Sequence, residues 1–233
     1  MIKGTQRRGR QTIVFCLLVL ANLVAPLRAA EESAMSNMEH LGDQRYRIGN
    51  IDIDRSENTF TVAGKILHLN DALEYLAIST NGSKEYESLL ELATSPREFN
   101  LACILIGFDE KHSVKPRYQF DERKPTGQGV KIELTWEVDG EVKEISGSNA
   151  MLAGETTFDD DGWIYIGSTT SEDGQQFMAE IGGTLIGFVH DPYSVIDHVN
   201  GGGIGAYGLI TGNNPELPPE GSAITLRISL VAK

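Results

Sequence analysis

The stretch LEYLAISTNGSKEYESLLEL (Leu73–Leu92), followed by TSPREFNLACILIGF (Thr94–Phe108), decides the fold that we expect from this sequence. Asn81-Gly82 divides the first part into two strand-like runs, and an Asn-Gly pair accommodates the positive φ angles of a type I′ hairpin turn. The tetrapeptide Ser95-Pro96-Arg97-Glu98 then begins a helix, because its first and last residues can form a capping box and proline suits the first helical position. The stretch therefore predicts an antiparallel hairpin followed at once by a packed helix.

Alternating apolar and polar residues predict further half-buried strands beyond this unit. The alternation is regular over Lys131–Val138 and Ala223–Val231, and Asp139-Gly140 marks a second hairpin turn. A second short helix is expected at Asp191-Pro192, since Asp can cap a helix that Pro begins. We therefore expect an α+β fold, predominantly antiparallel β-sheet with two short helices.

The first 30 residues have the order of a secretory signal peptide. Basic residues come first, an apolar run begins at Ile13, and small residues end the segment at Ala29-Ala30. The run is shorter than the roughly 18 residues that span a bilayer, so we expect cleavage and no permanent anchor. The sequence thus predicts a signal peptide over residues 1–30, a flexible leader over 31–47 and a single domain over 48–233, in a periplasmic or secreted protein.

The composition is acidic, with a formal net charge of −13. Five of the 20 basic residues lie in the predicted signal, so its removal leaves 15 against 33 acidic residues and a formal charge of −18. Such a charge repels nucleic acid and anionic lipid, and we expect no nucleic-acid partner. Cys103 is the only cysteine beyond the signal, so no internal disulfide is expected. No later stretch is apolar enough to predict a transmembrane helix after signal removal.

Two segments carry a resemblance to a known family. These are Glu74 to Gly82 with Glu87-Ser88-Leu89, and Asp191-Pro192 with Asp197. Together with the intervening strands, they make the chain from Ile48 to Lys233 resemble the YdjY-like family of uncharacterised exported bacterial proteins. The resemblance implies an envelope protein and supplies no catalytic residue, because the family has no defined activity to carry over.

The densest group of metal-ligating residue types is His190, Asp191, Asp197 and His198. Two imidazoles and two carboxylates this close in sequence can bind a divalent metal ion. The alternative is structural: Asp191 caps the predicted helix, His190 ends a strand, and the other two are solvated. Their spacing matches no established motif such as HExxH.

Three further groups of residues show weaker patterns that could indicate a functional site. Glu74, Glu85 and Glu87 share one face of the predicted hairpin. They form an acid–base group or a solvent-facing acidic strip, or Glu87 is held by a base on the opposite strand. Asp159-Asp160-Asp161-Gly162 resembles a calcium loop but lacks the expected first and last ligands. The GxGxxA string at Gly201–Ala206 neither follows a buried strand nor opens a helix, so we expect a loop there.

The sequence predicts a non-enzymatic binding or interaction module of the envelope, whose partner is an unknown envelope protein or small ligand. The alternative is a metal-dependent hydrolase centred on His190–His198. No cofactor is predicted, apart from a divalent metal ion in that alternative. A site is expected either at the acidic face from Glu74 to Glu87 or at the His190–His198 segment, and the sequence does not choose between them.

Overall fold

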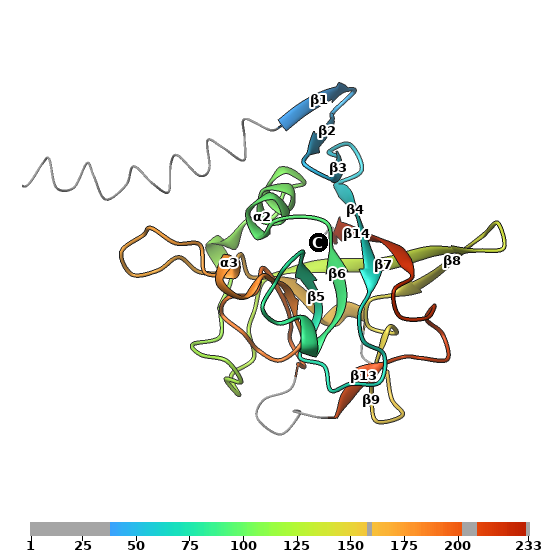
Figure 1. Cartoon of the computed structure of the whole chain (residues 1–233). Helices are drawn as coiled ribbons and strands as arrows, with labels where there is room; N and C mark the ends of the chain where they lie inside the picture. Colours follow the sequence, from blue (N-terminus) through green and yellow to red (C-terminus); the bar gives the residue numbers. More distant parts are fainter. Residues whose placement is uncertain (1–37, 158–159, 202–208, 232–233) are drawn as a thin grey trace, which may run out of the picture.

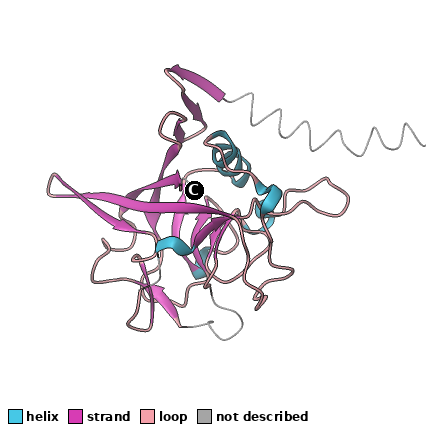
Figure 2. Ribbon diagram, turned by 180° about the vertical axis from the view of Figure 1, so that it is seen from behind, coloured by secondary structure: helices cyan, strands magenta, loops and turns pink. Residues whose placement is uncertain are grey.

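The computed structural model describes residues 38–157, 160–201 and 209–231 (Figure 1). The predicted signal peptide therefore lies outside the described residues, as do most of the GxGxxA string and Asp159. Strands are far more common than helices in the described chain, and the few helices lie outside the sheet (Figure 2).

Eight strands close into a barrel in the order β4, β14, β7, β10, β12, β11, β5 and β6, and the pairing of β6 with β4 completes the ring. The bounds of these strands are β4 (Thr59–Ile66), β5 (Tyr75–Ser79), β6 (Ser88–Leu92), β7 (Gln128–Val138), β10 (Trp163–Tyr165), β11 (Thr184–Gly187), β12 (Ile196–His198) and β14 (Ala223–Leu230). The predicted α+β class is therefore wrong, because the protein is mostly β and its sheet is closed. Within this sheet only β5–β6 and β11–β12 pair in parallel, and the other pairings are antiparallel. Pairing between β4 and β6 could not be read from alternation within either strand.

Six further strands lie outside the barrel ring. Their bounds are β1 (Met38–Gly42), β2 (Arg45–Ile48), β3 (Ile51–Asp54), β8 (Glu141–Ser146), β9 (Met151–Ala153) and β13 (Ile210–Gly212). β1, β2 and β3 continue the sheet outward from β4, β8 pairs with β7, and β9 pairs with β13 in a separate two-stranded sheet. The predicted flexible leader over residues 31–47 is thus corrected for its described part, because Met38–Ile48 forms two paired strands.

β4 changes neighbours along its length, and Gly64 permits the change. The first half of β4 pairs with β3 and its end pairs with β6. A Cβ at Gly64 would lie 2.5 Å from the carbonyl oxygen of Glu91, closer than real side chains approach. The glycine is therefore required for the close contact that closes the barrel.

The Leu73–Leu92 stretch does not form the predicted hairpin. β5 and β6 are parallel, with Tyr75 opposite Ser88 and Ala77 opposite Leu90. Asn81 does adopt a positive φ of 62°, but its turn begins a return loop that includes the short 3-10 helix η1 (Glu85–Glu87). The second hairpin prediction is confirmed: Asp139 and Gly140, with φ of 53° and 81°, connect antiparallel β7 and β8.

The predicted helix after Ser95 is confirmed as α2 (Pro96–Leu105), with both halves of its capping box in place. Phe99 of this helix packs edge-on against Phe60 of β4, with ring centroids 5.3 Å apart. The second helix is α3 (Ala179–Gly182), whereas Asp191-Pro192 begins a turn. Shorter 3-10 turns are η2 (Glu110–His112) and η3 (Asp160–Gly162). In the described part of the chain, no helix has the length and apolarity to cross a membrane.

Candidate functional site

The four residues predicted to bind metal are all buried, with 0–4% of their surface exposed. They lie just after β11 and within β12, but their side chains do not converge. Among the described residues, no three or more His, Cys, Asp or Glu side chains form a group that could hold a metal ion. The sequence therefore located a buried polar segment, and each of its members has separate contacts.

His190 and His198 both have packing roles. His190 Nδ1 lies 2.6 Å from the carbonyl oxygen of Asp121, and its Nε2 lies 3.2 Å from the carbonyl oxygen of His198. The His198 ring packs against both Trp163 and Phe188, at centroid distances of 4.8 and 5.3 Å. His198 Nδ1 accepts a hydrogen bond from the backbone amide of Asn200. The two imidazoles therefore join neighbouring segments to the barrel wall.

Asp191 belongs to a second group, which includes the other predicted site. Tyr75 Oη donates to Asp191 Oδ2 at 2.9 Å, and Gln119 Nε2 donates to Glu74 Oε2 at 2.9 Å. The same Gln119 nitrogen lies 3.3 Å from Tyr75 Oη. These contacts, together with those of Lys84 described next, connect six residues: Glu74, Tyr75, Lys84, Glu87, Gln119 and Asp191. We call these six residues the acidic network. Asp191 of the His190–His198 segment therefore shares this group of contacts with Glu74 of the other predicted place.

Lys84 is the cation of the acidic network. Its Nζ lies 2.6 Å from Glu87 Oε1 and 5.8 Å from the centroid of the Tyr75 ring. The Lys84 side chain is 27% exposed, whereas Glu74, Glu87 and Asp191 are only 3–5% exposed. The predicted solvent-facing acidic strip is therefore wrong for Glu74 and Glu87, which are buried under the lysine and the surrounding loops.

Backbone hydrogen bonds fix Glu74 at the centre of this arrangement. Its amide donates to the carbonyl oxygen of Glu87 at 2.9 Å, and its own carbonyl accepts from Phe188 and Val189 at 2.8 and 3.1 Å. The parallel pairing of β5 with β6 and the antiparallel pairing of β5 with β11 create these contacts. The acidic network therefore depends on the barrel, which brings three separate segments together.

The acidic network favours protonated carboxyl groups. Burial, together with the nearby Glu87 carboxylate, raises the pKa of Glu74 to about 7, against the lowering effect of Lys84 and Gln119. Burial also raises the pKa of Asp191, although hydrogen bonds from Tyr193 and Tyr75 offset part of the shift. At Glu74 and Asp191 the lowering effect of Lys84 does not offset burial, because an ionised carboxyl loses its hydration there. The acidic network therefore binds protons more tightly than exposed acids do.

Asp197 lies beyond the acidic network in β12 and is fully buried. Its Oδ1 accepts from the amide of His198 at 2.7 Å, while its Oδ2 has no hydrogen-bond partner in the described part of the chain. Burial raises the pKa of Asp197 well above its ordinary value, and the charge of Asp191 adds to the shift. A protonated Asp197 is the form that this environment favours.

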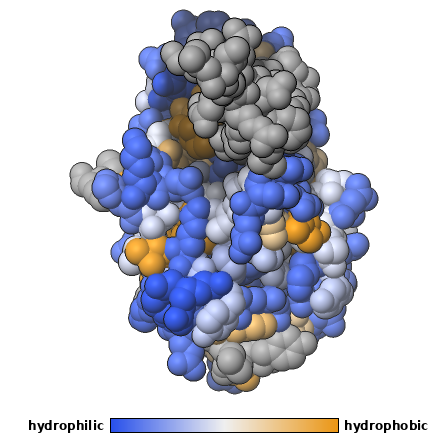
Figure 3. Space-filling model, turned by 90° about the vertical axis from the view of Figure 1, so that its left-hand side faces the viewer, coloured by the Kyte–Doolittle hydropathy of each residue, from blue (hydrophilic) through white to orange (hydrophobic). Residues whose placement is uncertain are grey.

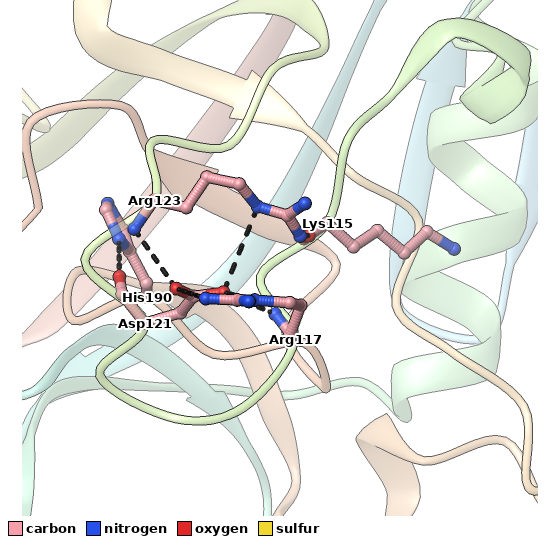
Figure 4. Close-up of polar contacts among 5 residues, drawn as sticks. All are labelled: Lys115, Arg117, Asp121, Arg123 and His190. Carbon is pink, nitrogen blue, oxygen red and sulfur yellow. Dashed lines mark hydrogen bonds and ion pairs between the residues drawn. The ribbon is translucent and has the colours of Figure 1, made fainter.

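A different polar cluster lies in the loop between α2 and β7, where Asp121 sits between Arg117 and Arg123 (Figure 4). Arg117 donates to Asp121 through its amide, Nε and Nη2 at 2.9–3.0 Å, and the amide of Arg123 donates at 3.1 Å. These donors, led by the Arg117 side chain, lower the pKa of Asp121. We call this arrangement the Asp121 clamp. The backbone carbonyl oxygen of Asp121 also contacts His190 Nδ1. The Asp121 clamp therefore connects this loop to the segment that contains Asp191.

Three exposed tyrosines lie close in sequence to members of the acidic network. Tyr86, Tyr118 and Tyr193 are 63, 54 and 41% exposed. Each is one or two residues from a network member: Glu87, Gln119 and Asp191, respectively. Sequence reasoning missed these tyrosines, because isolated exposed aromatics have no periodic pattern. The signal that could have found them is their position beside polar residues in three loops.

The fold and these contacts define a closed-barrel domain with a buried acidic network and with exposed tyrosines in the segments that carry its members. The chain belongs to the YdjY family, since that family's model, described as the YdjY domain, matches residues 51–229. The resemblance inferred from the sequence is thereby confirmed. No curated protein and no solved structure matches the sequence.

Proposed function

We propose that this chain is an exported, non-enzymatic binding module, and that it binds its partner through Tyr86, Tyr118 and Tyr193. The carrying observation is that these exposed tyrosines come from three loops that the acidic network connects. Tyrosine supplies a large contact area at low conformational cost, and it is enriched where proteins bind partners. Because the acidic network already orders these loops in the free protein, less conformational entropy is lost when the partner binds.

The state of the carboxyls supports binding over catalysis. Glu74, Glu87 and Asp191 are each paired with another side chain and are nearly inaccessible. A general acid or base must come within hydrogen-bond reach of the group that it protonates or deprotonates. The buried carboxyls of the acidic network therefore serve to position the loops in this proposal. Export rests on the signal-like order of the first 30 residues.

Site-directed photo-crosslinking in the intact host tests this proposal. A benzoyl-phenylalanine replaces each of Tyr86, Tyr118 and Tyr193 in turn, and Ile104, which is 50% exposed on α2, serves as the matched control position. We expect the same adduct from the tyrosine positions and none from position 104, in a protein whose mature N-terminus lies near Glu31. An exported, folded protein that gives no adduct at any of the three positions overturns the proposal.

The metal-dependent hydrolase remains the alternative prediction, and the placement of its four residues offers it no support. His190 directs both ring nitrogens at carbonyl oxygens, and His198 packs against two aromatic rings. Metal analysis of protein purified without chelator tests it directly. Stoichiometric zinc or manganese that is lost in a His190→Ala variant would favour the hydrolase over the binding module.

A further inference from the structure

The hairpin formed by β7 and β8 projects away from the barrel (Figure 1). β8 pairs with β7 on one side, and no strand within the described residues pairs with its other side. Val142, near the end of the hairpin, is 72% exposed, the largest value among the exposed apolar residues. An unpaired strand edge presents backbone groups that can pair with another strand.

The direction of these backbone groups follows from the ladder between β7 and β8. The amide of Gly147 donates to the carbonyl oxygen of Ile132 at 2.9 Å, and opposed residues of an antiparallel pair alternate between bonded and non-bonded. The Gly147–Ile132 pair is therefore bonded, and every second residue before Gly147 in the register is bonded as well. By this alternation, the backbone groups of Glu141 and Lys143 bond to β7. Val142 and Glu144 therefore direct their amide and carbonyl groups away from β7, toward the open edge.

The sequence of β8 is complementary to itself in one register. We consider two copies of β8 that pair antiparallel and are related by a twofold axis perpendicular to the sheet. Opposed side chains then lie on the same face of the sheet, so the axis passes through a residue, which lies opposite its own copy. An axis at Lys143 opposes two lysines, and one at Glu144 opposes two glutamates. An axis at Val142 places Glu141 opposite Lys143 twice, with the two valines in contact. It also brings the outward backbone groups of Val142 into a bonded pair.

We propose that a second copy of this chain pairs with β8 across this edge, in the antiparallel register centred on Val142. Each copy then covers the exposed Val142 of the other, and two cross-strand ion pairs flank the contact. Charged residues normally protect a strand edge from pairing, but here their signs are complementary in a single register. The paired segment is short, so the dimer is a weak, concentration-dependent one. This inference does not depend on the proposed binding through the three tyrosines.

Charge reversal tests the register. In Lys143→Glu two carboxylates oppose each other at both positions, and in Glu141→Lys two ammonium groups do so. Each variant alone is expected to dimerise roughly tenfold more weakly than the unchanged protein. Mixed in equal amounts, the two variants restore both opposite-charge pairs. Sedimentation velocity over a concentration series should therefore show two weakly associating single variants and a heterodimer in the mixture.

Two further variants complete the design. Val142→Pro removes the outward amide at an edge position where proline is tolerated, so the monomer should fold and the dimer should be lost. Lys111→Glu makes the same charge change at a side chain 78% exposed in another loop, and should dimerise normally. A protein that stays monomeric at every concentration, or a dimer unaffected by Val142→Pro and by charge reversal in β8, overturns the proposal.

Discussion

Asp121 and Asp191 are both buried carboxyls in segments that His190 connects, yet their pKa values are shifted in opposite directions. The Asp121 clamp surrounds one carboxyl with a guanidinium fork and two backbone amides, which hold it ionised. Asp191 receives a tyrosine hydroxyl and one amide, and its neighbours include further carboxyls. The comparison shows that the donors around a buried acid, more than its burial, decide its charge.

The two regions also respond to pH in different ranges. Raised pKa values in the acidic network make the folded state bind protons more tightly than the unfolded chain, so stability falls as pH rises through the folded values. The lowered pKa of Asp121 has the opposite sign, and its contribution is lost as pH falls below the ordinary aspartate value. Acidic and alkaline conditions should therefore weaken different contacts between the same loops.

Removing the Asp191 carboxyl should have the largest effect on stability. Asp191→Ala leaves the Tyr75 hydroxyl buried without its acceptor and opens a void, so we expect a loss of about 2–4 kcal/mol in the free energy of unfolding. Urea denaturation at pH 6 measures the difference, with Glu144→Ala in exposed β8 as a control expected to change it by less than about 0.5 kcal/mol. A loss similar to that of the control would show that the Tyr75–Asp191 contact does not stabilise the barrel.

Glu74→Gln should have a smaller effect that changes with pH. The pKa of Glu74 is about 7, against an ordinary value of 4.5, so its ionisation destabilises the folded protein increasingly between about pH 5 and pH 8. The amide can still accept from Gln119 and never ionises. We expect the variant to be more stable by about 1–2 kcal/mol at pH 8, a figure reduced because solvent reaches the lysine side of the acidic network, and nearly unchanged at pH 5.

The matched control for this prediction is the exposed neighbour Glu85. A Glu85→Gln variant makes the same charge change at an exposed side chain of η1, and its urea denaturation should follow the unchanged protein at both pH values. Parallel pH profiles for Glu74→Gln and the unchanged protein would contradict a raised pKa at Glu74.

Asp121→Asn should have the smallest effect, because its guanidinium partners are 59 and 46% exposed and solvent screens their charges. We expect a decrease of a few degrees in melting temperature at pH 7. The difference should shrink as pH falls below the ordinary aspartate value of 3.8, because the unfolded chain then takes up a proton while the lowered pKa keeps Asp121 ionised in the folded protein. Melting curves monitored by circular dichroism between pH 2.5 and pH 7 measure it, and a difference that grows toward acid would reverse the proposed sign.

Local chemistry predicted the elements well, and long-range pairing was beyond it. The capping box at Ser95 and the Asp139-Gly140 hairpin each depend on a few adjacent residues, and both predictions are confirmed. Asn81-Gly82 has the same local signal, but its strands pair in parallel. A turn that permits positive φ is compatible with either outcome, because the return loop and the barrel decide where β6 lies.

The candidate site shows the same division. The sequence pointed to Glu74, Glu87 and the His190–His198 segment separately, since unusual residue types stand out in any sequence. It did not place Asp191 against Tyr75, which is 116 positions earlier in the chain. Nor did it include Gln119, whose contact depends on a loop with no regular pattern. Contacts of this kind follow from barrel closure, which no short window of sequence contains.

The position of β14 has a consequence for the order of folding. This last strand lies between β4 and β7, so the barrel wall has a gap until residues 223–230 arrive. A chain emerging from the ribosome can form α2 and the β7–β8 hairpin early, because those contacts are local. It cannot close its barrel before residues 223–230 have been synthesised. A protein that must cross a membrane unfolded, as the predicted signal peptide implies, gains time for recognition by the export machinery from this late step.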